Sequence, residues 1–228
     1  MKIHRRYLSW LLCAPFLWVI MVGASGCAVS NAGKTVGRGT VQLEGSVGGP
    51  LFKNLGATMP VPNIPLGARY GFTDRLDGQA HVNVLPIVMG GFAQVDAGVT
   101  MGVLSQRQGH GVNLALSLGG AVMSDLHTSV RATPITGVTL SRQFGRVIPF
   151  VGFESYVDFG RPRAIGNVHG GVELEWDRIS LQASAMWLDP GFDAAESTMK
   201  YVSPGNSGAL GVLLGLKVRP RAWNRGAQ

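Results

Sequence analysis

Between residues 93 and 103, apolar and polar side chains alternate without interruption. The apolar positions are Ala93, Val95, Ala97, Val99, Met101 and Val103, and the intervening residues are Gln94, Asp96, Gly98, Thr100 and Gly102. Such alternation predicts a strand, and its length suits the ~9–11 residues of a strand that crosses a bilayer. The polar face carries mostly small or uncharged residues, where a solvated sheet face would usually carry Lys and Glu. The pattern therefore predicts an apolar face in lipid and a polar face in the lumen of a closed barrel.

Ten segments follow this pattern, and the connections between them alternate in length. We expect strands at residues 40–47, 66–73, 78–85, 92–104, 111–122, 135–144, 147–158, 166–176, 179–188 and 209–218, with a β-bulge near Pro134. One set of connections is short (74–77, 105–110, 145–146 and 177–178), and the other is mostly longer (48–63, 86–91, 123–133, 159–165 and 189–207). Short turns at one end and long loops at the other are typical of outer-membrane barrels. The predicted fold is all-β, a single antiparallel up-and-down transmembrane β-barrel of about ten strands within a range of about eight to twelve.

The composition supports a barrel and argues against several other classes. The chain has 33 glycines and only 14% charged residues, which disfavours a soluble enzyme or a disordered chain. Removing a leader with three basic residues lowers the formal charge from +7 to +4. This excess is mild and has no interleaved aromatic residues, so no nucleic acid partner is predicted.

The first 27 residues have the three parts of a secretory signal. A basic start precedes an apolar run from Tyr7 to Gly23 and the sequence Ala24-Ser25-Gly26-Cys27. The last four residues resemble the lipobox of bacterial lipoproteins, with Ala24 in place of the usual Leu. That resemblance implies a covalent lipid on Cys27, the only prosthetic group expected, and Ala28 after it implies sorting to the outer membrane. An uncleaved membrane anchor is the alternative.

Residues 38–218 resemble small bacterial outer-membrane β-barrels, in phrases such as Gly67-Ala68-Arg69-Tyr70-Gly71-Phe72-Thr73-Asp74-Arg75-Leu76. No subfamily is indicated. The resemblance implies the outer membrane of a Gram-negative bacterium, with the N-terminus on the periplasmic side. The implied partners are outer-membrane lipid, lipopolysaccharide through Arg161 and Arg163, and the barrel assembly and lipoprotein sorting machineries. The expected organisation is a signal peptide (1–26), an acylated N-terminus with a flexible tether (27–37), the barrel (38–218) and a basic tail (219–228).

The inward positions are predicted to hold a polar network with an acidic excess. Six acids (Glu44, Asp96, Glu154, Asp158, Glu173 and Glu175) face two bases (Arg69 and Lys217), together with His81 and His169. The candidate site is therefore Glu44, Arg69, His81, Asp96, Glu154, His169 and Glu173. One interpretation is a satisfied polar core in which Arg69 bridges Glu44 and another acid. The other is a narrow, cation-preferring path.

No catalytic, cofactor-binding or metal-binding residue is predicted, and a structural, interaction or minor permeation role is favoured. One alternative is a hydrolase at the extracellular rim. His127-Thr128-Ser129 resembles the His-x-Ser of outer-membrane lipid A deacylases. Asp125 and His127 in one loop, with Asp189 and Asp193 in another, resemble the Asp and His pairs at the rim of omptin proteases. Another alternative is a soluble lipocalin-like lipoprotein, which would bury Val95, Val99, Leu114 and Leu116 around an apolar ligand.

Overall fold

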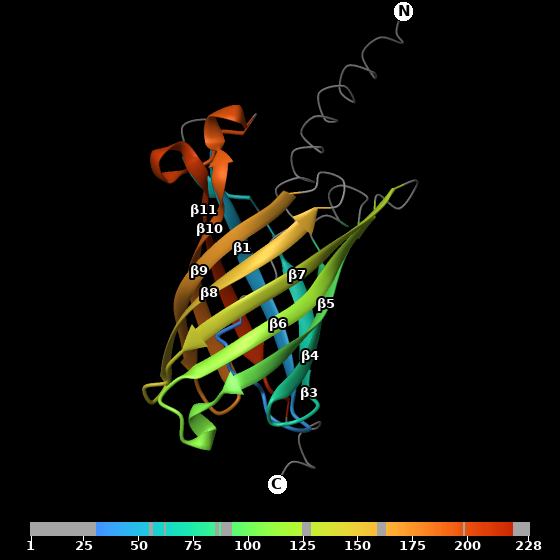
Figure 1. Cartoon of the computed structure of the whole chain (residues 1–228), viewed down its shortest axis with the longest axis vertical. Helices are drawn as coiled ribbons and strands as arrows, with labels where there is room; N and C mark the ends of the chain where they lie inside the picture. Colours follow the sequence, from blue (N-terminus) through green and yellow to red (C-terminus); the bar gives the residue numbers. More distant parts are fainter. Residues whose placement is uncertain are drawn as a thin grey trace, which may run out of the picture.

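The computed structural model describes residues 31–54, 57–61, 63–84, 87, 93–124, 129–158, 163–197 and 199–220. Ten of its strands form a closed antiparallel barrel: β1 (Val41–Asn54), β3 (Pro65–Gly71), β4 (Leu76–Asn83), β5 (Ala93–Leu104), β6 (Asn113–Ser124), β7 (Val130–Ser141), β8 (Val147–Asp158), β9 (Arg163–Glu175), β10 (Ile179–Asp193) and β11 (Ser207–Val218) (Figure 1). Each strand pairs with the next in this order, and β11 pairs back with β1. The predicted fold is confirmed. No helix in these residues is long and apolar enough to span a membrane.

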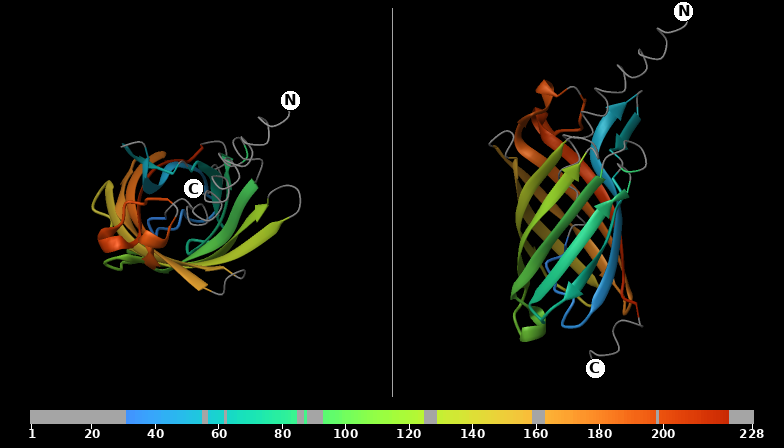
Figure 2. Two further views of the ribbon diagram at one scale, coloured as in Figure 1. Left: turned by 90° about the horizontal axis from the view of Figure 1, so that it is seen from above. Right: turned by 90° about the vertical axis from the view of Figure 1, so that its right-hand side faces the viewer.

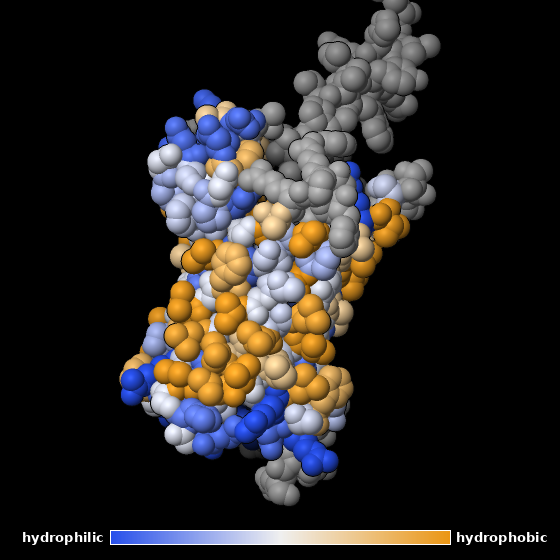
Figure 3. All heavy atoms as spheres, in the orientation of Figure 1, coloured by the Kyte–Doolittle hydropathy of each residue, from blue (hydrophilic) through white to orange (hydrophobic). Residues whose placement is uncertain are grey.

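The apolar side chains point out of the barrel and the polar side chains point in. Val99 and Leu116 are 40% and 44% exposed, whereas Arg69 and His81 are 2% and 1% exposed. In the view of Figure 3, an apolar band covers the wall and hydrophilic surface bounds it above and below. This distribution is the reverse of a soluble protein, in which apolar side chains gather inside. The predicted orientation of the two faces is confirmed.

The lipocalin-like alternative is wrong for the same reason. It requires Val95 and Val99 inside the barrel, but both are exposed on the wall. On the opposite face of the strands, Asn113 is buried in the lumen and donates to Gln106 and Ser141.

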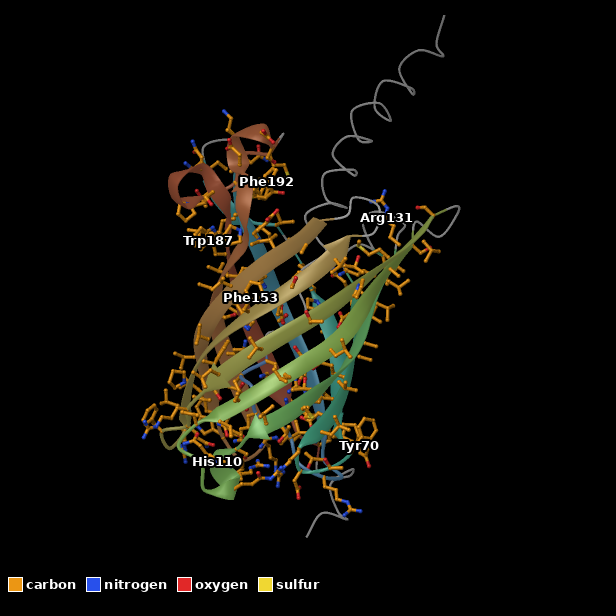
Figure 4. All side chains as sticks on the ribbon, in the orientation of Figure 1. Tyr70, His110, Arg131, Phe153, Trp187 and Phe192 are labelled. Atoms are coloured by element: carbon orange, nitrogen blue, oxygen red, sulfur yellow. The ribbon has the colours of Figure 1, made fainter. Side chains whose placement is uncertain are left out.

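The two ends of the barrel differ. Residues 72–75, 105–112, 142–146 and 176–178 connect strands at the short-turn end, where the 3-10 helix η1 (Gln106–Gln108) also lies. The opposite, long-loop end carries the other connections. Exposed aromatic side chains lie at the strand ends of the short-turn end: Tyr70, Phe72, Phe144 and Trp176. Trp187 and Phe192 lie near the long-loop end (Figure 4). This arrangement resembles the aromatic girdles of membrane barrels.

Two segments expected to be loops are partly regular. β1 continues to Asn54 and forms a hairpin with β2 (Ala57–Pro60), while β10 continues to Asp193 and leads to the 3-10 helices η2 (Ala194–Glu196) and η3 (Pro204–Asn206). The backbone N–H of Lys53 donates to the carbonyl of Lys200 at 2.8 Å, and that of Val202 to Leu51 at 2.8 Å. These bonds join the two segments into one lobe at the long-loop end.

The β-bulge expected near Pro134 is absent from the pairing of β6 with β7. Pro134 pairs with Gly120 in a register that runs unbroken along both strands. The apolar pattern is disturbed there because Ile135 shares the inward side of β7 with Thr139, while Thr136 is exposed. Pairing of β7 with β8 begins only at Ile135, since Pro134 has no N–H to donate.

Candidate functional site

Four titratable side chains from consecutive strands of the barrel meet in the lumen. Glu44 lies between Arg69 and His81, with its Oε1 3.2 Å from Arg69 Nε and its Oε2 3.2 Å from His81 Nε2. His81 Nδ1 is 2.8 Å from Asp96 Oδ1. Arg69 also donates through Nη2 to Gln79 at 3.0 Å. Each of the four occupies an inward position, and the strand register then places them side by side. The lumen at this level is filled with paired charges.

Two inward glycines make room for the two lumen histidines. Gly67 lies directly opposite His81 in the β3–β4 pairing, and Gly152 lies opposite His169 in the β8–β9 pairing. A Cβ on either glycine would collide with the facing imidazole, for Gly152 at 2.5 Å from His169 Nε2. These glycines therefore accommodate rings and do not leave an open channel.

Hydrogen bonds continue the network toward the short-turn end. Gln42 donates to Glu44 at 2.8 Å and accepts from Arg219 Nε at 3.2 Å. Arg219 Nη2 lies 2.6 Å from Glu175 Oε1. The network thus connects β1 with β9 and with the residue after β11. A second pair, Lys217 and Glu173, lies beside it with an N–O distance of 2.6 Å.

Residues 31–39, which we call the N-terminal plug, lie inside the ring of strands near the short-turn end (Figure 2, left, blue). Ala32, Thr35 and Val36 are buried, and Ala32 packs against the inward side chains of Ile148 and Phe150. The described part of the segment expected to be a flexible tether is therefore packed within the barrel.

Polar contacts hold the plug against several strands. Lys34 Nζ pairs with Glu175 and donates to Gln143 Oε1 at 3.1 Å. The backbone N–H of Val36 donates to Asp77 Oδ2 at 2.8 Å. Burial lowers the pKa of Lys34 below the usual value for lysine, although the carboxylate of Glu175 acts in the opposite direction. Further contacts come from Asn31 to Thr100 at 3.3 Å and from Thr35 to the carbonyl of Asp74 at 2.8 Å.

The plug also depends on a close approach of two backbones. A Cβ on Gly71 would collide with the carbonyl oxygen of Gly37, so only glycine at the end of β3 lets the plug lie against the wall. A small polar cavity remains between the plug and the barrel wall. It is lined by Asn31, Ala32, Lys34, Thr35, Val36, Gln42, Arg69, Glu173, Lys217 and Arg219.

The described lumen and plug together carry six acidic and four basic side chains, an acidic excess of two. The acids are Glu44, Asp77, Asp96, Glu154, Glu173 and Glu175, and the bases are Lys34, Arg69, Lys217 and Arg219. This excess is smaller than the four expected from the sequence, because Lys34 and Arg219 lie in the lumen. The side chain of Asp158 lies outside the described residues.

The remaining candidates are not part of the main network. Glu154 accepts from Tyr156 at 2.6 Å and from Asn167 at 3.4 Å. His169 is buried, its ring centroid is 6.2 Å from that of Phe150, and neither of its ring nitrogens has a hydrogen-bond partner among the described residues. Within the same residues, no group of three His, Cys, Asp or Glu side chains could hold a metal ion. Several of the sequence candidates lie outside the described residues, namely Cys27, Asp125, His127 and Arg161, and so does the side chain of Arg163.

Sequence reasoning missed Asp77 and Arg219 because it placed them in a turn and in the tail. The alternation of inward and outward positions along each strand could have identified both residues. Asp77 is in phase with His81, and Arg219 is in phase with Lys217, so extending each strand by a residue or two would have placed them inside. Lys34 had no such signal, because its position depends on contacts distant in sequence.

No protein-family model and no curated protein sequence matches the chain. Among solved structures, the NanC porin is 6% identical, with 79% of this chain and 100% of that chain covered and a TM-score of 0.43. The outer membrane protease OmpT from Escherichia coli is 10% identical (79% and 97% covered, TM-score 0.41). The translocator domain of the autotransporter NalP from Neisseria meningitidis is also 10% identical (93% and 96% covered, TM-score 0.40). Likenesses at this level decide nothing about activity.

Proposed function

We propose that the chain is an outer-membrane β-barrel lipoprotein with a structural or interaction role, and that it conducts at most a minor, cation-preferring flux. The observation that carries this proposal is the exposed apolar wall around a lumen of paired charges. Exposure of so much apolar surface is unfavourable in water and favourable in the hydrocarbon of a bilayer. A closed barrel also leaves no unpaired strand edge in the hydrocarbon.

The outer membrane is supported by the barrel itself, since closed barrels with short turns at one end are the form that spans this membrane. In this placement the short-turn end faces the periplasm, and the expected lipid on Cys27 enters the periplasmic leaflet. The partners would be outer-membrane lipid, including lipopolysaccharide at the long-loop end, and the assembly and sorting machineries during biogenesis.

A lysine in place of Val99 tests the membrane placement. Val99 lies midway along β5 and is exposed, so the Val99→Lys substitution should cost about 2–4 kcal/mol if hydrocarbon surrounds it. We expect loss of the heat-modifiable barrel from membrane fractions. Val130→Lys, at the long-loop end of β7, is the matched control and should cost about 0–1 kcal/mol. Normal assembly of Val99→Lys in water-soluble form would overturn the proposal.

The lipid on Cys27 can be tested separately. Metabolic labelling with an alkyne-bearing fatty acid should mark the protein, and Cys27→Ser should abolish the label while the barrel still shows heat-modifiable mobility. An unlabelled wild-type protein would remove the lipoprotein part of the proposal and leave the barrel intact.

The acidic excess of the lumen favours the minor permeation role as a second candidate, because rings of acidic side chains select cations. The alternative of a rim hydrolase gains no support from Asp193, whose Oδ1 accepts from the N–H of Ala195 and caps η2.

A further inference from the structure

Exposed charge is divided unevenly between the two ends of the barrel. Within the described ranges, six exposed arginines lie at the short-turn end: Arg38, Arg75, Arg107, Arg142, Arg146 and Arg178. Only two exposed acids, Asp74 and Asp177, accompany them, which leaves four net positive charges. The described part of the long-loop end carries one net positive exposed charge, from the bases Lys53, Arg131 and Lys200 and the acids Asp193 and Glu196, while Asp189 there is half-buried.

Three of these arginines neighbour the exposed aromatic residues of the same end, whereas Arg107 reaches toward the plug, with its Nη1 3.1 Å from where a Cβ on Gly37 would lie. The guanidinium carbon of Arg142 is 5.0 Å from the ring centroid of Phe144. Arg146 follows Phe144 by two residues, and Arg178 follows Trp176 by two. Aromatic rings at the ends of a membrane barrel lie at the level of the lipid headgroups. The neighbouring arginines then lie at the level of the headgroup phosphates.

We propose that four of these arginines, Arg75, Arg142, Arg146 and Arg178, form a ring that binds the phosphate groups of anionic phospholipids in the leaflet at the short-turn end. Guanidinium groups bind phosphate through paired hydrogen bonds, and Arg stacked on an aromatic ring keeps this fork in place. A zwitterionic lipid offers the same phosphate but carries an ammonium group that cancels its charge. Four net positive charges therefore select phosphatidylglycerol over phosphatidylcholine. This inference rests on the proposed membrane placement.

Two tryptophans allow each end to be measured in the same protein. The full chain has five tryptophans, and replacing the other four by phenylalanine leaves either Trp176 at the short-turn end or Trp187 at the long-loop end. Each variant is reconstituted in mixed phosphatidylglycerol and phosphatidylcholine vesicles in which only one lipid species is brominated. We expect brominated phosphatidylglycerol to quench Trp176 more strongly, with about a fivefold preference for each arginine engaged at low salt, and no preference at Trp187.

Substitutions of the arginines test whether they cause the lipid preference. Replacing Arg75, Arg142, Arg146 and Arg178 with Gln should abolish the preference at Trp176, whereas Lys53→Gln with Arg131→Gln at the opposite end should leave it intact. Heat-modifiable mobility confirms that each variant is folded. Equal quenching by both lipids at Trp176, or a preference that survives the four substitutions, overturns the arginine ring. If neither lipid quenches either tryptophan, the membrane placement itself fails.

Discussion

Deleting residues 31–37 is expected to convert a nearly silent barrel into one that conducts cations. The plug fills the short-turn end of the lumen, and its removal takes away Lys34, the partner of Glu175. The acidic excess of the described lumen then grows from two to three, because one base is lost from the lumen. Planar-bilayer recordings should show small discrete steps, severalfold above the wild-type level, with a reversal potential that favours cations.

Two further variants make this prediction specific. Gly71→Val keeps the whole chain but places side-chain atoms where the carbonyl of Gly37 lies, so it should also raise conductance. Adding Glu175→Gln to the deletion should reduce the cation preference. Replacing Ala57–Pro60 with a two-residue turn, at the long-loop end, is the control and should leave the barrel silent. If the deletion is equally silent, the side chains of the wall close the lumen by themselves and the permeation role fails.

Arg69→Met is expected to be the most destabilising substitution in the lumen. Arg69 is 2% exposed, and without it Glu44 keeps a buried negative charge with one fewer cation beside it. Breaking a buried pair in this way costs about 3–5 kcal/mol. Urea unfolding of the vesicle-reconstituted protein, followed by tryptophan fluorescence, measures the loss.

The matching double substitution separates the charge from the packing. Arg69→Met with Glu44→Gln removes both members of the pair and should recover part of the loss, since no uncompensated charge stays buried. Arg131→Gln, on the exposed surface, should change the free energy of unfolding by less than about 0.5 kcal/mol. A cost for Arg69→Met as small as that of Arg131→Gln would show that the network contributes little to stability.

The strands within the apolar band were predictable because a bilayer imposes a simple rule on them. Residues 147–158 were expected as a strand and form β8 with the same bounds. Beyond the apolar band, side chains no longer need to alternate between lipid and lumen. The extension of β1 through Pro50, Leu51 and Phe52 has no clean alternation, so a loop was predicted where β1 and β2 form a hairpin. Pro134 misled for a related reason, since the inward Ile135 breaks the pattern of side chains without breaking the backbone pairing of β7 with β6.

The lumen was predictable in its inward positions but not in its connections. Alternation alone points Glu44, Arg69, His81 and Asp96 inward, and the order of strands makes them neighbours. The contact between Lys34 and Glu175 joins residues 141 positions apart, and no local pattern encodes such a contact. The plug therefore required the three-dimensional structure.

The partners of the plug have a consequence for the order of assembly. Lys34 pairs with Glu175 on β9, and Arg219 connects the carboxylate of Glu175 to Gln42 on β1. The site that holds the N-terminal plug is therefore complete only when the residue that follows the last strand, β11, is in place. Contacts of this range form late in folding, because the intervening chain must first be ordered. Docking of the plug therefore waits until the last strand of the barrel is in place. Until the plug docks, the ring of strands lacks the segment that fills its short-turn end.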